Sequence, residues 1–196
     1  MKKLFLVLAV ILAGCEDSNT KNESSDLTFV STEGNFGSSN GSISVFRSGK
    51  LIQEIKDIGD VVQSILVHNE KLFVLVNNSH LIKVYQISDD GLELPGISVS
   101  TEGSSPREMV VENNKLYFTN YNTQDVKVLN LSTYYIEDSI SLDGLPESIV
   151  SDGASLWVAI NMNADYSSAS SVVKINIESG KVTKTYEAVS YTHLTL

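Results

Sequence analysis

Asparagine, aromatic and arginine side chains stand at the ends of apolar segments, where they could bind a polar organic ligand. Amide groups, aromatic rings and a guanidinium together suit a sugar or a substituted ring. An Asn at the end of a strand also satisfies turns with its side chain, so a structural role is the alternative for each Asn. The predicted ligand-binding residues are Asn35, Phe36, Asn77, Arg107, Asn120, Tyr121, Asn161 and Met162.

Motifs for catalysis or for a resident metal are scarce. The chain has no nucleophile elbow, phosphate loop or dinucleotide fingerprint. His68 and His80 fall in different predicted loops, and Asp89-Asp90-Gly91 is not followed by the alternating carboxylates of a calcium loop. We therefore expect no cofactor, and the sequence favours a binding protein over an enzyme.

The elements that position these residues are copies of one leucine-led strand. Leu72–Asn77, Leu116–Asn120 and Leu156–Asn161 share an apolar core and begin 44 and 40 residues apart. A fainter copy begins at Leu27, 45 residues before the first. Repeats of this length that contain only strands are typical of four-stranded blades packed around an axis. The sequence predicts an all-β fold, a partial β-propeller over residues 27–187.

Each repeat carries a second apolar landmark seven residues before its leucine. These landmarks are Ile65, Met109 and Ile149. They mark an inner strand A, which is followed by strand B, an alternating strand C and a more polar outer strand D. The count is one three-stranded blade, beginning at strand B, and three four-stranded blades. Trp157 is expected in the core because its equivalents are Phe73 and Tyr117.

Successive strands reverse direction, so the B–C loops and the D–A loops are predicted to share one face around the channel mouth. The B–C loops are Glu33–Gly41, Asn77–His80, Asn120–Gln124 and Asn161–Ser170. The D–A loops are Gly59–Gln63, Thr101–Arg107 and Asp143–Glu147. We expect Asn77, Asn120 and Asn161 to occupy one position of the blade.

Two segments resemble known propeller families. Leu116–Asn120, a short loop and Val126-Lys127-Val128 resemble the YVTN-type β-propeller repeat, and Pro106 and Pro146 match the proline before its strand A. The segment Glu33–Val45 resembles the first blade of YncE-like surface lipoproteins. The resemblance implies a seven-bladed ring of which about half is present. It also implies relatives that capture nutrients such as corrinoids.

The N-terminal end resembles a bacterial lipoprotein signal. Residues 1–14 combine two lysines with an apolar run, and Leu12-Ala13-Gly14-Cys15 resembles the lipobox. The resemblance implies a lipid on Cys15 and attachment to the bacterial outer membrane, at the cell surface or the periplasmic face. A cleaved signal with a chance cysteine is the alternative. Residues 15–26 contain no large apolar side chain and are predicted to be a flexible acidic tether.

The chain is acidic, with a net charge of −10 that becomes about −12 after loss of residues 1–14. A field of this sign disfavours nucleic acid as a partner. Residues 188–196 do not match the next expected strand and resemble the translation of a sequencing adapter. They are expected to be a non-native tail on a gene fragment, with a native strand as the alternative.

Three functions are consistent with these patterns. The first is an envelope-anchored module that captures a small polar ligand, sugar-like or corrinoid-like, without catalysis. The second is a calcium-dependent propeller hydrolase or lactonase, which needs Glu33, Asn77, Glu108 and Asn120 to converge on one ion. The third is a scaffold for a partner protein at the surface.

Overall fold

The computed structural model describes residues 27–187, which form sixteen strands and their connecting loops. Cys15, the predicted signal peptide, the tether and the predicted tail 188–196 lie outside the described residues. Between residues 27 and 187 there is no helix, and hence none long and apolar enough to cross a membrane.

The strands form four antiparallel sheets, here called blades 1 to 4. Blade 1 contains β1 (Leu27–Thr32), β2 (Ser42–Arg47) and β3 (Lys50–Ile55). Blade 2 contains β4 (Val62–His68), β5 (Lys71–Val76), β6 (Leu81–Ser88), β7 (Gly91–Leu92) and β8 (Ile97–Ser100). Blade 3 contains β9 (Pro106–Glu112), β10 (Lys115–Asn120), β11 (Asp125–Asn130) and β12 (Ile136–Ser141). Blade 4 contains β13 (Leu145–Ser151), β14 (Ser155–Met162), β15 (Ser168–Asn176) and β16 (Lys181–Glu187).

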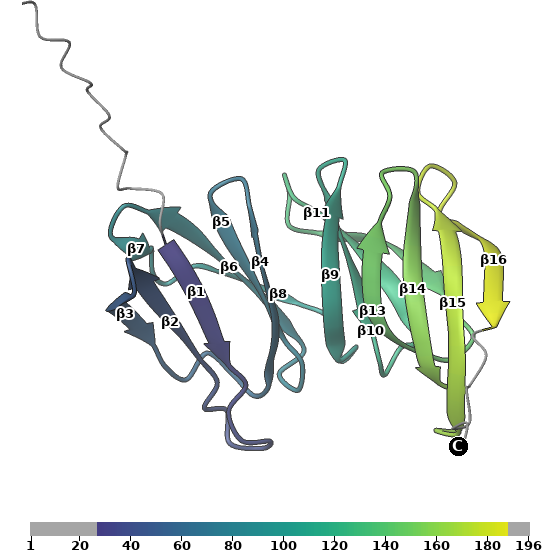
Figure 1. Cartoon of the computed structure of the whole chain (residues 1–196), viewed down its shortest axis with the longest axis horizontal. Helices are drawn as coiled ribbons and strands as arrows, with labels where there is room; N and C mark the ends of the chain where they lie inside the picture. Colours follow the sequence, from purple (N-terminus) through teal and green to yellow (C-terminus); the bar gives the residue numbers. More distant parts are fainter. Residues whose placement is uncertain (1–26, 188–196) are drawn as a thin grey trace, which may run out of the picture.

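The four blades fan out side by side, with blades 1 and 2 on one side of Figure 1 and blades 3 and 4 on the other. The A strands β4, β9 and β13 contact one another in sequence. This arrangement confirms the predicted all-β partial propeller. Blade 2 differs in one detail, because its D position is divided between β7 and β8, which both pair with β6.

Three apolar cores hold the arc together, and each lies between two blades. In β5, Leu72 and Val74 enter the core shared with blade 1, whereas Phe73 and Leu75 enter the core shared with blade 3. All four side chains are at most 1% exposed. Successive strand residues point to opposite faces, so strand B loses water on both sides. This explains why it reads as a continuous apolar run.

The first blade corrects the predicted repeat by one residue. Phe29 packs with Val45 in the core between blades 1 and 2, so it points toward the next blade along the chain. Phe73 also points toward the next blade, into the core between blades 2 and 3. Phe29 is therefore the equivalent of Phe73, and the interval is 44 residues, not the 45 that follows from aligning Leu27 with Leu72. A shift of one residue exchanges the two faces of a strand. The apolar start of β1 hid this shift.

Trp157 is not a core residue, contrary to the prediction. It is partly exposed on the face of blade 4 that turns away from blade 3. Its ring lies 5.8 Å from the ring of Tyr186, and the Lys174 ammonium lies 4.7 Å from its centroid. Its equivalents Phe73 and Tyr117 are buried because a further blade covers them.

Candidate functional site

The B–C and D–A loops lie on one face and are joined by backbone hydrogen bonds. The Asn77 N–H donates to the Val61 carbonyl, and the Tyr121 N–H donates to the Ser105 carbonyl at the equivalent place in blade 3. In Figure 1 the β1–β2 loop and the β14–β15 end both lie along the lower edge of the arc. The predicted sharing of one face by the two loop sets is thus confirmed.

Arg107 is held between the two neighbouring blades at the inner edge of this face. Its Nε and Nη2 donate to Oε1 of Glu147 at 2.9 and 2.5 Å, and its Nη1 donates to Oε1 of Gln63 at 3.1 Å. The side chains of Arg107 and Glu147 are 27% and 25% exposed. A guanidinium bound from both sides keeps one orientation and loses little freedom when a ligand arrives.

An aromatic surface lies beside this guanidinium. The Arg107 guanidinium carbon stands 5.5 Å from the centroid of Tyr121, within the range of a cation–π contact. The Tyr121 hydroxyl donates to Sδ of Met162 at 3.1 Å, and its ring lies 6.4 Å from the ring of Tyr166. Tyr166 is 68% exposed. We call Arg107, Tyr121, Met162 and Tyr166 the Arg107 cluster.

The loop that carries Tyr166 is shaped by Asp165. The Ser167 hydroxyl and backbone N–H both donate to Oδ1 of Asp165 at 2.5 and 2.9 Å. These hydrogen bonds, the hydroxyl first, lower the pKa of Asp165 below its ordinary value because they favour the charged form. The carboxylate stays ionised at neutral pH and keeps this turn closed.

Two of the predicted Asn residues are engaged inside the fold. Asn120 is fully buried, where its Oδ1 accepts from the Ser104 hydroxyl at 2.6 Å and its Nδ2 donates to the Phe118 carbonyl. Nδ2 of Asn77 donates to the Pro106 carbonyl at 2.9 Å and so joins blade 2 to blade 3. Asn161 is exposed. A ligand on the loop face can therefore reach Asn161 but not Asn120.

The three Asn residues do not occupy one blade position, contrary to the prediction. Asn77 and Asn161 lie five residues after the leucine of their repeat, whereas Asn120 lies four residues after Leu116. The backbone pairing of Tyr121 matches that of Asn77, which makes Tyr121 the equivalent residue in blade 3. Asn120 consequently takes the buried place that Val76 holds in blade 2.

Asn35 and Phe36 lie on the β1–β2 loop, away from the contacts of the Arg107 cluster. The buried carboxylate of Asp60 accepts the Gly37 N–H with both oxygens, at 3.0 and 2.9 Å. The Asn35 N–H donates to Oδ1 of Asn40 at 2.8 Å. Phe36, at the tip of this tethered loop, is 80% exposed.

Of the eight predicted ligand-binding residues, the structure brings together Arg107, Tyr121 and Met162. It adds Gln63 and Glu147, which the sequence reasoning did not single out. A sequence signal was available, because Gln63, Arg107 and Glu147 each lie two residues before the strand A landmark of their blade. Radial repetition places equivalent residues of adjacent A strands side by side.

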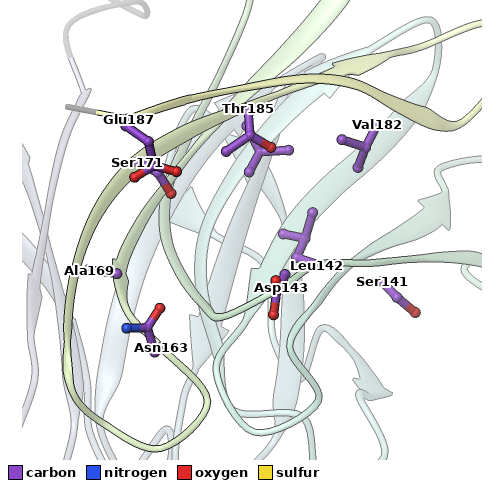
Figure 2. Close-up of a pocket in the computed structure, with 10 residues that line it drawn as sticks. Ser141, Leu142, Asp143, Asn163, Ala169, Ser171, Val182, Thr185 and Glu187 are labelled. Atoms are coloured by element: carbon purple, nitrogen blue, oxygen red, sulfur yellow. The ribbon is translucent and has the colours of Figure 1, made fainter.

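The outer rim of the same face holds a separate pocket of ≈ 340 Å³, shown in Figure 2. Blade 3 contributes Leu142 and Asp143, and blade 4 contributes Asn163, Ser171 and Glu187 among others. None of the eight predicted residues lines it. Its lining includes two carboxylates and no Lys or Arg, so the acidic character of this face extends to the rim.

Three of the four residues that the hydrolase hypothesis requires for a calcium site, Asn77, Glu108 and Asn120, form hydrogen bonds within the fold. Between residues 27 and 187, no three His, Cys, Asp or Glu side chains lie close enough to hold a metal ion. Glu108 accepts from the Ser64 hydroxyl at 3.2 Å, and the amides of Asn77 and Asn120 are engaged as described above. Glu33 lies on the β1–β2 loop.

Comparison with known proteins identifies the fold. No family model and no curated protein matches the chain. Among solved structures, it aligns with the "putative 6-phosphogluconolactonase" of Bacteroides fragilis NCTC 9343 at a TM-score of 0.68 and 14% identity, covering 85% of this chain and 55% of that chain. Hydrazine synthase of Kuenenia stuttgartiensis aligns at a TM-score of 0.67 and 17% identity, covering 85% and 47%.

A third neighbour is named for the same architecture. The β-propeller domain of Cps50 (Swd1) from Myceliophteria thermophila aligns at a TM-score of 0.57 and 12% identity, covering 72% of this chain and 45% of that chain. The chain thus spans about half the length of these structures. Identities this low show the fold alone, and that fold is the β-propeller.

Proposed function

We propose that the chain is the propeller module of an envelope-anchored lipoprotein that captures a small polar ligand at its loop face without chemical conversion. The observation that carries this proposal is the meeting of Arg107, Tyr121 and Met162 beside the exposed ring of Tyr166. Pre-oriented polar and aromatic groups are what a binding site needs. A surface protein that presents such groups to this face is an alternative occupant.

The anchoring part of the proposal rests on sequence. Lipidation of Cys15, a YncE-like surface lipoprotein and an outer-membrane location would together place the loop face within reach of extracellular or periplasmic solutes. Metabolic labelling with an alkyne-tagged palmitate tests it. The wild-type chain should be labelled and should sediment with membranes. The C15S variant should not be labelled and should not sediment with membranes. Labelling of C15S would contradict the proposal.

Ligand capture is tested by titrating the chain with a panel of sugars and with cyanocobalamin, followed by calorimetry. Tyr121→Ala should weaken the binding of any probe that binds the wild-type chain by about tenfold, because the central ring of the aromatic surface is lost. The matched control is Tyr135→Ala, which removes an exposed tyrosine of the rim. Equal weakening by both variants would place the ligand elsewhere.

A calcium-dependent lactonase is the second candidate, favoured by the likeness to the Bacteroides protein named above. It predicts a rise in melting temperature when calcium is added, since a ligand that binds the folded state stabilises it. The proposed binding module predicts no shift. A calcium-dependent shift together with lactone hydrolysis would replace the binding function with this one.

A further inference from the structure

We infer that the Arg107 cluster selects neutral, hydroxyl-bearing ring ligands and rejects phosphorylated or carboxylated ones, an inference that rests on the ligand-capture function proposed above. The argument depends on charges in the seven loops of this face. Arg107 is the only Lys or Arg in the seven loop segments given in the sequence analysis, and Lys56, at the start of the observed connection between β3 and β4, is paired with Glu54 at 3.1 Å. Arg107 is therefore the basic group that the cluster itself could offer to an anion.

That charge is already matched. Nε and Nη2 of Arg107 converge on one carboxylate oxygen of Glu147, and Nη1 donates to the neutral amide of Gln63. Three of the five N–H groups of a guanidinium are thereby used. An incoming phosphate would have to compete with Glu147 for these donors and would lie beside its like charge.

The surroundings reinforce this preference. Six carboxylate residues stand in the same seven loops, against the single arginine. They are Glu33, Asp60, Glu102, Asp143, Glu147 and Asp165. A surface lined with one sign of charge repels ligands of that sign. Carboxylate oxygens also accept hydrogen bonds from hydroxyl groups, so the same surplus suits a sugar.

The uncharged part of the cluster supplies a stacking surface. Tyr121 is fixed by Arg107 on its face and by Met162 at its hydroxyl, and Tyr166 lies beside it with 68% of its surface exposed. Stacking on a tyrosine requires an apolar ring face and does not depend on a charge on the ligand. Ring shape and hydroxyl groups would thus determine affinity.

The first test compares two probes on the unmodified chain by calorimetry: methyl β-D-glucopyranoside and glucose 6-phosphate. The neutral glucoside should bind about tenfold more tightly or better. Binding of neither probe would overturn the proposed capture of sugars together with this inference. Equal or tighter binding of glucose 6-phosphate would overturn the selectivity alone and leave ligand capture standing.

The second test reverses the preference. Glu147→Gln keeps a hydrogen-bond acceptor for Arg107 but removes the opposing charge, so affinity for glucose 6-phosphate should rise about tenfold. Affinity for the glucoside should not rise, because the glucoside carries no charge that Glu147 repels. Glu33→Gln makes the same charge change on the same face away from Arg107 and should raise the affinity for glucose 6-phosphate by less than about twofold. An equal gain in Glu33→Gln, or no gain in a folded Glu147→Gln, would overturn the assigned role of Glu147.

Discussion

Tyr117 and Trp157 occupy the same position of strand B in two successive blades, and their surroundings differ. Tyr117 is 4% exposed in the core between blades 3 and 4. Trp157 contacts Tyr186 and Lys174 of its own blade on a face that no described residue of another blade covers. The comparison shows that burial in this fold comes from the neighbouring blade and not from the blade itself.

The opposite end of the arc has a different composition. The outward face of blade 1 carries Thr28, Val30 and Phe46, whereas that of blade 4 carries Trp157 and Tyr186. Both faces lie at an end of the arc, and the blade 4 face has two neighbouring aromatic rings where the blade 1 face has the ring of Phe46. The two ends of the arc therefore differ in their aromatic side chains. The difference in burial that can be tested most directly is the one between the blade 4 face and the cores.

The largest effect is expected inside a core. Phe118 is fully buried between blades 2 and 3, so Phe118→Ala should lower the free energy of unfolding by about 3–5 kcal/mol. Urea unfolding followed by circular dichroism measures this loss. A change below about 1 kcal/mol would mean that this core is loosely packed, contrary to the burial described.

A direct test of the comparison uses the two equivalent positions. Tyr117→Ala should cost about 3 kcal/mol through a lost core contact, and Trp157→Ala about 1 kcal/mol through lost surface cation–π and aromatic contacts. The same urea experiment applies. Equal losses would show that the blade 4 face is covered in solution, and the comparison between the two blades would then fail.

A smaller effect separates the two classes of Asn. Asn120→Ala leaves the buried Ser104 hydroxyl without its acceptor and should cost about 1–3 kcal/mol. Asn161→Ala, on the exposed loop, should stay within about 0.5 kcal/mol. Thermal melts of both variants measure these losses of stability. Equal losses would contradict the one-residue difference between the positions of Asn120 and Asn161 in their repeats.

The smallest effect is a titration on the blade 4 face. The Trp157 indole donates to Asp152 at 2.8 Å, and this bond, with the Ala154 and Ser155 backbone N–H groups, holds the pKa of Asp152 below its ordinary value of 3.8. A lowered pKa means that the contribution to stability is present above the unfolded value and is lost as pH falls through the folded one.

Fluorescence measures this titration, because Trp157 is the only tryptophan in the chain. Its emission should change between pH 5 and pH 2 with a midpoint below 3.8. Asp152→Asn should abolish the transition, with Asp138→Asn as the matched control. A transition that persists in Asp152→Asn would assign the change to another carboxylate.

Much of the fold was accessible from the sequence because the repeat is local. The spacing between Ile65 and Leu72 depends on one hairpin, and it predicted strands A and B in three blades. The face of the blade on which a strand residue lies is harder to predict. A shift of one residue at Leu27 or at Asn120 moves each side chain to the opposite face while the apolar pattern barely changes. Backbone pairing between strands settles such shifts, and the sequence alone does not contain it.

The site was predictable only in part for a related reason. Arg107, Tyr121 and Met162 were found by residue type and loop position, and the structure brings them into contact. Glu147 and Gln63 act through neighbouring blades, so their roles depend on which strands are adjacent in space. The prediction that Trp157 is buried was wrong for the same reason, because burial at this position depends on a neighbouring blade that covers it.

The alternation of strand B between two cores also bears on engineering. Because β5 sends Leu72 to one side and Phe73 to the other, a single blade has no interior of its own. A blade cut out and grafted into another protein would expose both rows of apolar side chains, unless its recipient supplied matching surfaces on each flank. The smallest transferable cassette in this architecture is a blade together with the two surfaces that enclose it.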